Sequence, residues 1–177
     1  MMRLSSNVTP VYLSLGSNLG DRKMNLREAL HWLEEQVAID GVSALYETSP
    51  VGPPEQPWYL NAVCGGTTEL EPRELLAFVK GIEQEMGRVP TVRWGPRIID
   101  IDILFYNDLV LNAPDLIIPH LGISDRPFVL VPLADIAPEF IHPHLGESIS
   151  ALLDKLSSDT YEMCRVAEPE EWVPCMK

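Results

Sequence analysis

The hydrophobic pattern predicts four β-strands. Apolar and polar residues alternate over residues 11–15 and again over residues 98–105, which is typical of strands that bury one face. Between these segments, β-branched and aromatic residues predict two further strands, over residues 42–46 and 59–68. A proline-rich loop over residues 49–57 separates this second pair, and a loop of this length suggests a functional role.

Two helices are predicted between the strands. Apolar residues recur at helical spacing in two segments: Leu26, Leu30, Leu33 and Val37 in the first, and Leu75, Val79, Ile82 and Met86 in the second. Asp21 can cap the first helix, which we expect over residues 22–36. The second helix follows Pro72, a residue favoured in the first turn, and Gly87 is its expected end.

The predicted order of elements is β-α-β-β-α-β. This order is typical of the ferredoxin-like class of α+β folds, in which an antiparallel sheet carries both helices on one face and leaves the other face available. Beyond residue 107, frequent prolines indicate additional C-terminal elements, with one more helical pattern over residues 149–156. We therefore expect a single domain over residues 1–158 and a peripheral acidic tail over residues 159–177.

The composition fits a globular protein of a reducing compartment. Of the 177 residues, 46% are hydrophobic and 22% are charged, and no apolar run approaches the roughly 18 residues of a membrane helix. The net charge of −13 opposes binding to nucleic acid or to an anionic membrane. The three cysteines form no Cys-x-x-Cys pair and predict neither a disulfide framework nor a zinc site. We expect a cytoplasmic protein that binds small molecules, as a monomer or alternatively a dimer.

Two aspartates on the last predicted strand are candidate metal ligands. Side chains alternate along a strand, so Asp100 and Asp102 are expected on the same face, opposite the helices. Neighbouring carboxylates repel each other, whereas Mg²⁺ is commonly held by one or two carboxylates together with substrate phosphates. Two aspartates on a solvated sheet face would give the same pattern, so the pair alone does not decide between these interpretations.

The segment before this strand reverses the charge of the protein locally. Residues 87–99 contain Arg88, Arg93 and Arg97 and no acidic residue, although the chain as a whole is strongly acidic. Guanidinium groups bind phosphate oxygens through paired N–H groups, and arginines together with Mg²⁺ neutralise charge in phosphoryl transfer. Arginines directly before the aspartate pair therefore favour a polyphosphate site over a set of surface ion pairs.

An aromatic residue and an amide are expected on the same open face. Alternation along the third strand directs Tyr59 and Asn61 away from the helices, where they could stack on a flat heterocycle and bind its edge. His120, Arg126 and Phe128 offer two cations and an aromatic ring that could close the site. Loop or core roles fit the spacing of these three residues equally well.

Four motifs in chain order carry a resemblance to a known family. They are residues 15–20 (LGSNLG), 56–61 (QPWYLN), 93–104 (RWGPRIIDIDIL) and 119–120 (PH). The chain resembles the 6-hydroxymethyl-7,8-dihydropterin pyrophosphokinases of folate biosynthesis over about residues 11–157. This resemblance implies a ferredoxin-like enzyme that transfers the β,γ-diphosphoryl group of ATP to the hydroxymethyl oxygen of a reduced pterin and releases AMP.

The resemblance also implies a role for each matching residue. It implies two Mg²⁺ ions bound by Asp100 and Asp102, and catalytic arginines, Arg88 and Arg97, that hold the phosphates. The further nucleotide contacts that it implies are Glu83, Trp94, Ile103, His120 and Arg126. The pterin pocket that it implies is formed by Thr48, Val51, Tyr59, Asn61 and Phe128.

Two departures from the family pattern and two alternative functions stand beside this interpretation. Between Arg88 and Trp94 the chain is one residue shorter than some relatives and has no second arginine soon after Arg88. Leu121 stands where some members have an aromatic residue. The alternatives are another Mg²⁺-dependent phosphoryl or nucleotidyl transferase, and a catalytically silent pterin- or nucleotide-binding module. AMP as a product distinguishes the pyrophosphokinase from both.

Overall fold

The computed structural model describes residues 7–52, 55–91, 93, 95–156 and 162–173. Within these ranges no helix is long and apolar enough to cross a membrane. The elements up to residue 106 are β1 (Thr9–Ser17), α1 (Arg22–Leu33), β2 (Val37–Val42), β3 (Leu45–Thr48), β4 (Tyr59–Thr68), α2 (Pro72–Glu85) and β5 (Asp100–Tyr106). The elements that follow are β6 (Leu111–Asn112), β7 (Ile117–Ile118), η1 (Ile123–Asp125), α3 (Pro127–Ile136), α4 (Ile149–Lys155), β8 (Met163–Ala167) and α5 (Pro169–Trp172).

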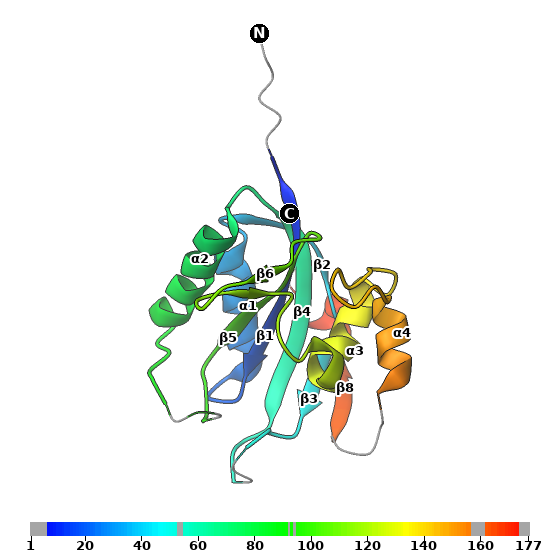
Figure 1. Cartoon of the computed structure of the whole chain (residues 1–177). Coiled ribbons are helices and arrows are strands. Elements are labelled where there is room, and N and C mark those ends of the chain that lie inside the picture. Colours follow the sequence, from blue (N-terminus) through cyan, green and yellow to red (C-terminus); the bar gives the residue numbers. More distant parts are fainter. Residues whose placement is uncertain (1–6, 53–54, 92, 94, 157–161, 174–177) are drawn as a thin grey trace.

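An antiparallel sheet with the strand order β5-β1-β4-β3-β8 forms the middle of the molecule (Figure 1). Three of the four predicted strands are confirmed as β1, β4 and β5. β2 also pairs with β4. Val42 lies opposite Cys64 and Tyr46 lies opposite Asn61, so a step of four residues from β2 to β3 matches a step of only three along β4. One residue between β2 and β3 therefore has no partner in β4. The single strand expected over residues 42–46 is therefore two strands joined at a β-bulge.

The helices α1 and α2 cover one face of this sheet, as their apolar stripes predict (Figure 1). The core between them contains buried strand residues and buried helix residues, among them Leu13, Leu15, Ala62, Ile101, Leu26, Leu30, Leu75 and Val79. The Asp21 carboxylate accepts the Met24 N–H at 3.0 Å and caps α1. α1 ends at Leu33 instead of residue 36, because Val37 already begins β2, where its buried side chain still joins this core.

The other face of the sheet is not fully open, so the expectation that this face is left available is wrong in part. α3 and α4 cover part of it, as Figure 1 shows. A second core lies there, formed by Val63, Leu104 and Phe105 of the sheet, Val129, Leu130 and Leu133 of α3, and Ile149 and Leu152 of α4. α3 is apolar around most of its circumference and therefore has to be covered by other elements.

Part of the acidic C-terminal segment is built into the sheet. β8 pairs with β3, and the indole of Trp172 is fully buried, where its N–H donates to the Ser43 carbonyl at 3.0 Å. Residues 162–173 therefore differ from the peripheral tail expected there. The predicted domain boundary at residue 158 lies outside the described residues and stays a prediction.

The two cysteines of the described region differ sharply in environment. Cys64 lies in the first core, where burial raises the pKa of its thiol to about 12, whereas Cys164 on β8 is exposed. We expect iodoacetamide at about pH 8 to modify Cys164 and to leave Cys64 intact, because the thiolate is the reactive form. Peptide mass spectrometry would measure both sites, with denatured protein as the control in which both react. Equal modification of the native protein at both positions would contradict this core assignment.

Candidate active site

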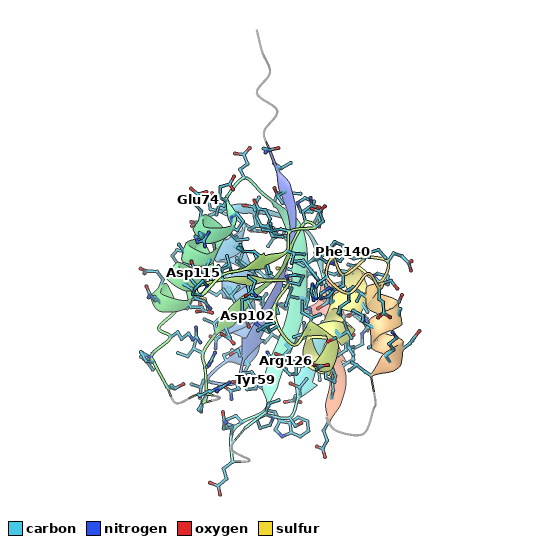
Figure 2. The ribbon with its side chains drawn as sticks, viewed as in Figure 1. Tyr59, Glu74, Asp102, Asp115, Arg126 and Phe140 are labelled. Carbon is cyan, nitrogen blue, oxygen red and sulfur yellow. The ribbon has the colours of Figure 1, made fainter. Side chains whose placement is uncertain are left out.

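A cavity of about 270 Å³ lies on the part of the sheet face that α3 and α4 leave uncovered. Ten residues predicted for the site line this first pocket: Thr48, Val51, Tyr59, Asn61, Arg97, Asp100, Asp102, His120, Arg126 and Phe128. Figure 2 shows three of them, Tyr59, Asp102 and Arg126, grouped near one end of the sheet. They come from β4, from β5 and from the residue that precedes α3. The alternation argument correctly brings the side chains of the two strands to one face.

The two aspartates lie side by side at the floor of the first pocket. Asp100 pairs with Gly16 and Asp102 with Ser14 across the β1–β5 ladder. Burial raises the pKa of the Asp102 carboxyl most, and repulsion from Asp100 raises it further. Among the groups whose charge lowers this pKa, His120 has the largest effect. Burial and the neighbouring carboxylate therefore both disfavour the charged form of Asp102.

Two arginines of the preceding loop reach Asp100. The guanidinium of Arg97 lies 3.1 Å from an Asp100 oxygen, and that of Arg88 lies 3.3 Å from the same oxygen. Both arginine side chains are about three-quarters buried. Arg93 is exposed, and Trp94 lies outside the described residues. Arg88 and Arg97, which were predicted to act on the same phosphates, are thus brought together.

Glu83 lies behind this pair and lines neither of the two pockets described here. Its side chain is 2% exposed and accepts the Ile101 N–H at 2.7 Å, the Lys80 ammonium at 3.1 Å and the Arg88 guanidinium. Burial raises the pKa of the Glu83 carboxyl, against the opposing charges of Lys80 and Arg88. In this arrangement Glu83 anchors Arg88 beside β5, and a direct contact of Glu83 with nucleotide stays a prediction.

A buried amide is held at the other end of the first pocket. The Asn61 side-chain amino group donates to the Thr48 hydroxyl at 2.7 Å. A Cβ on residue 16 would lie 2.9 Å from the side-chain oxygen of Asn61, so a larger residue than Gly16 would displace this amide. Burial raises the pKa of the neighbouring Tyr59, whose ring is therefore neutral at physiological pH. An aromatic ring beside an oriented amide suits a flat, polar heterocycle.

Asn18 is a buried residue that the sequence did not single out. Its side-chain oxygen accepts the Arg97 backbone N–H at 2.7 Å, and its amino group donates to the Pro57 carbonyl at 3.2 Å. Its backbone N–H also donates to the Arg97 carbonyl at 3.0 Å. Asn18 therefore joins the loop that carries Arg97 to the loop that leads into Tyr59. The LGSNLG motif, which carries part of the family resemblance, was the available signal, but no role was predicted for Asn18.

A second cavity of about 270 Å³ adjoins the first. Asp102 and His120 line both cavities, which makes them a shared wall. The remaining walls of this second pocket come from α2, β5 and the segment that leads to His120, and include Leu76, Lys80, Ile103, Asp115, Ile117 and Leu121. Ile103, expected to contact nucleotide, therefore lies in the second pocket and not in the first.

Comparisons with known proteins show which family the chain is similar to. Residues 12–138 match the family model described as 7,8-dihydro-6-hydroxymethylpterin-pyrophosphokinase. A 2-amino-4-hydroxy-6-hydroxymethyldihydropteridine pyrophosphokinase of Methylorubrum extorquens is 43% identical over 157 residues, which are 88% of this chain and 98% of the relative. A folic acid synthesis protein of Dictyostelium discoideum is 51% identical over 135 residues, which are 76% of this chain. The chain spans only about 20% of the length of that longer relative.

The fold is also found in solved structures. The wild-type HPPK-DHPS of Plasmodium falciparum, crystallised with pteroate, aligns with a TM-score of 0.70 at 22% sequence identity. The alignment covers 84% of this chain and 42% of that chain. At this identity the similarity supports the arrangement of the helices and the sheet.

Proposed function

This chain belongs to the 7,8-dihydro-6-hydroxymethylpterin-pyrophosphokinase family, and we propose that it transfers the diphosphoryl group of ATP to 6-hydroxymethyl-7,8-dihydropterin. The hydroxymethyl oxygen loses its proton to solvent and forms a new bond to the β-phosphorus, the bond between that phosphorus and the α,β-bridging oxygen breaks, and AMP leaves with that oxygen. The observation that carries this proposal is the shared wall: Asp102 and His120 line both pockets. Two substrates bound in adjoining pockets would meet there.

The first pocket suits the pterin. Tyr59 and Phe128 offer aromatic rings to the faces of the heterocycle, and Asn61 offers an oriented amide to its edge. The second pocket suits the nucleotide, because Ile103 and Leu76 supply apolar area and Lys80 supplies a cation. ATP bound there would direct its phosphates towards the shared wall and the arginines.

The carboxylates of Asp100 and Asp102 fit Mg²⁺. Their oxygens are hard ligands, and a cation would relieve the repulsion from Asp100 that adds to burial in raising the pKa of Asp102. The described residues contain no group of three or more potential His, Cys, Asp or Glu ligands, so ATP phosphates and water would complete the coordination. Two bound Mg²⁺ ions would neutralise phosphate charge and orient the reacting groups.

Arg88 and Arg97 would neutralise the remaining charge of the phosphates. Arg88 and Arg97 both lie against Asp100. With Mg²⁺ on that carboxylate, both guanidinium groups would be released from Asp100 and could bind phosphate oxygens, while Glu83 would still hold Arg88. Asn18 would keep the backbone of Arg97 at a fixed position relative to the loop before Tyr59. This position would be maintained while the site excludes water.

Three finer properties belong to the same proposal. The order of β1, β4, β5 and the β2–β3 strand, with α1 and α2 on one face, supports a ferredoxin-like core. We also infer a protein that acts in the cytoplasm, as a monomer or alternatively a dimer.

The decisive experiment identifies the nucleotide product. The protein would be incubated with Mg²⁺-ATP, with and without 6-hydroxymethyl-7,8-dihydropterin, and the nucleotides separated by chromatography. Pterin-dependent AMP is the expected result. ADP would indicate a simple kinase, and pterin binding without any nucleotide product would indicate a catalytically silent binding module; either result would overturn the proposal.

Replacement of Asn18 tests how the two loops are joined. Asn18→Ala is expected to lower kcat/KM about 10- to 100-fold, because small misplacements of catalytic groups are costly. Asn18→Asp keeps an acceptor for the Arg97 N–H but loses the donor to Pro57, so its effect should fall on the pterin KM more than on kcat. The control is Asn112→Ala, at an exposed position in β6. Steady-state kinetics that show no difference between Asn18→Ala and this control would contradict the role.

A further inference from the structure

The short strand β3 receives hydrogen bonds on both of its edges. β4 pairs with its inner edge and β8 with its outer edge, where Glu47 lies opposite Cys164 and Thr48 opposite Met163. The ladder continues past the end of β3, because the Ser49 N–H donates to the Glu162 carbonyl at 2.9 Å. Thr48 and Ser49 both line the first pocket. The C-terminal segment therefore reaches the wall of the candidate pterin site.

The far end of this segment is fixed as well. Trp172 is fully buried, its indole N–H donates to the Ser43 carbonyl at 3.0 Å, and its own carbonyl accepts the Arg27 guanidinium. Ser43 lies in the bulge between β2 and β3, where its hydroxyl accepts the Val63 N–H at 2.9 Å. Residues 162–173 thus hold β3 at both ends, near Ser43 and near Ser49.

β3 in turn carries the parts that would face the pterin. The Thr48 hydroxyl accepts the Asn61 amide and so sets its orientation. Glu47 pairs with Arg22 at 2.8 Å, and the same guanidinium donates to the Trp58 carbonyl at 2.8 Å, beside Tyr59. Without β8, a strand of four residues would have an unpaired edge, and short exposed elements open easily.

We propose that residues 162–173 act as a positioning strap, which holds β3 so that the first pocket keeps the shape that binds the pterin. This inference rests on the proposed function, since it assigns the pterin to that pocket. The strap does not contact the second pocket, whose lining comes from other elements. Its loss should therefore weaken pterin binding and leave nucleotide binding almost unchanged.

A matched pair of prolines tests the strap. Hydrogen-bonded pairs alternate along an antiparallel ladder, so the bonded pair of Ser49 and Glu162 predicts that the Cys164 N–H bonds to β3 and that the Met163 N–H points outwards. Cys164→Pro removes a ladder donor, whereas Met163→Pro places the same residue where an edge strand tolerates it. Trp172→Phe is a milder third variant that keeps an aromatic ring and removes the donor to Ser43.

Binding of the pterin would be measured by calorimetry in the presence of Mg²⁺ and a non-hydrolysable ATP analogue, and binding of the analogue alone by the same method. We expect Cys164→Pro to raise the pterin Kd about tenfold and Trp172→Phe about fivefold, with Met163→Pro and all analogue affinities within about twofold of wild type. Equal losses for both ligands, or equal effects of the two prolines, would overturn the proposal. If Cys164→Pro does not fold, Trp172→Phe decides by the same criteria.

Amide hydrogen exchange of the ligand-free protein separates this inference from the proposed function. Cys164→Pro should speed exchange of the Ser49 amide at least about tenfold relative to Met163→Pro, because Cys164→Pro weakens the ladder between β3 and β8. Unchanged exchange would overturn the strap, whatever the ligand. A wild-type protein that binds no pterin would overturn the proposed function, while the exchange result would still judge whether the segment holds β3.

Discussion

Asp102→Asn is expected to lower kcat at least about 10³-fold and to change the pterin Kd by no more than about threefold. The asparagine keeps the size of the side chain but removes the charge that would hold Mg²⁺ at the shared wall. Pterin affinity should survive, because Tyr59, Asn61 and Phe128 lie elsewhere in the first pocket. Single-turnover formation of AMP and a separate binding titration would measure the two quantities.

The matched control is Asp108→Asn, at an exposed position just after the same strand. It removes one negative charge from the protein without touching either pocket, so its kcat should equal that of wild type. An Asp102→Asn variant with more than about a tenth of the wild-type kcat would contradict the metal assignment.

Asp102→Asn should also stabilise the metal-free protein. Because the pKa of Asp102 is raised, the folded state holds this proton more tightly than the unfolded chain does. The free energy of unfolding therefore falls as the pH rises from the ordinary aspartate pKa through the raised one, and the loss is complete above it. Thermal unfolding from about pH 4 to about pH 8 should show an advantage in Tm for Asp102→Asn that grows with pH. An advantage independent of pH would contradict this account.

Arg97→Ala should lower kcat about 10³-fold and Arg97→Lys about 10²-fold, since lysine keeps the charge but loses the planar pair of donors. Arg97 lies beside Asp100 and is fixed through its backbone by Asn18, so its guanidinium is already near the expected phosphates. Single-turnover rates of AMP formation would measure the effect, and binding of a non-hydrolysable ATP analogue would show whether the ground state is also affected. Full activity of Arg97→Lys would mean that charge alone suffices at this position.

Local periodicity explains why much of the first pocket could be predicted. Alternation with period two needs only neighbouring residues, and it correctly places Tyr59, Asn61, Asp100 and Asp102 on one face. The contacts of Asn18 could not be predicted in this way. They join residues that are 39 and 79 positions apart in the chain, and no local pattern reports such a distance.

The remaining differences between expectation and structure have other causes. Prolines at the start and inside α3 obscure a helix that is apolar nearly all round, so its place on the second face was not expected. The strap begins with a five-residue edge strand and is buried mainly through Trp172, which leaves almost no periodic signal. Glu83 shows a third cause, because the sequence cannot distinguish a carboxylate that faces a ligand from one that anchors Arg88.

The wall that the two pockets share has a thermodynamic consequence. Because Asp102 and His120 border both cavities, whatever occupies one cavity alters the charge and the solvent met by the occupant of the other. Linkage then requires symmetry: the factor by which bound nucleotide changes the affinity for the pterin equals the factor by which bound pterin changes the affinity for the nucleotide. The order in which the two molecules bind can therefore depend on their association rates. The total free energy of binding both molecules is the same in either order.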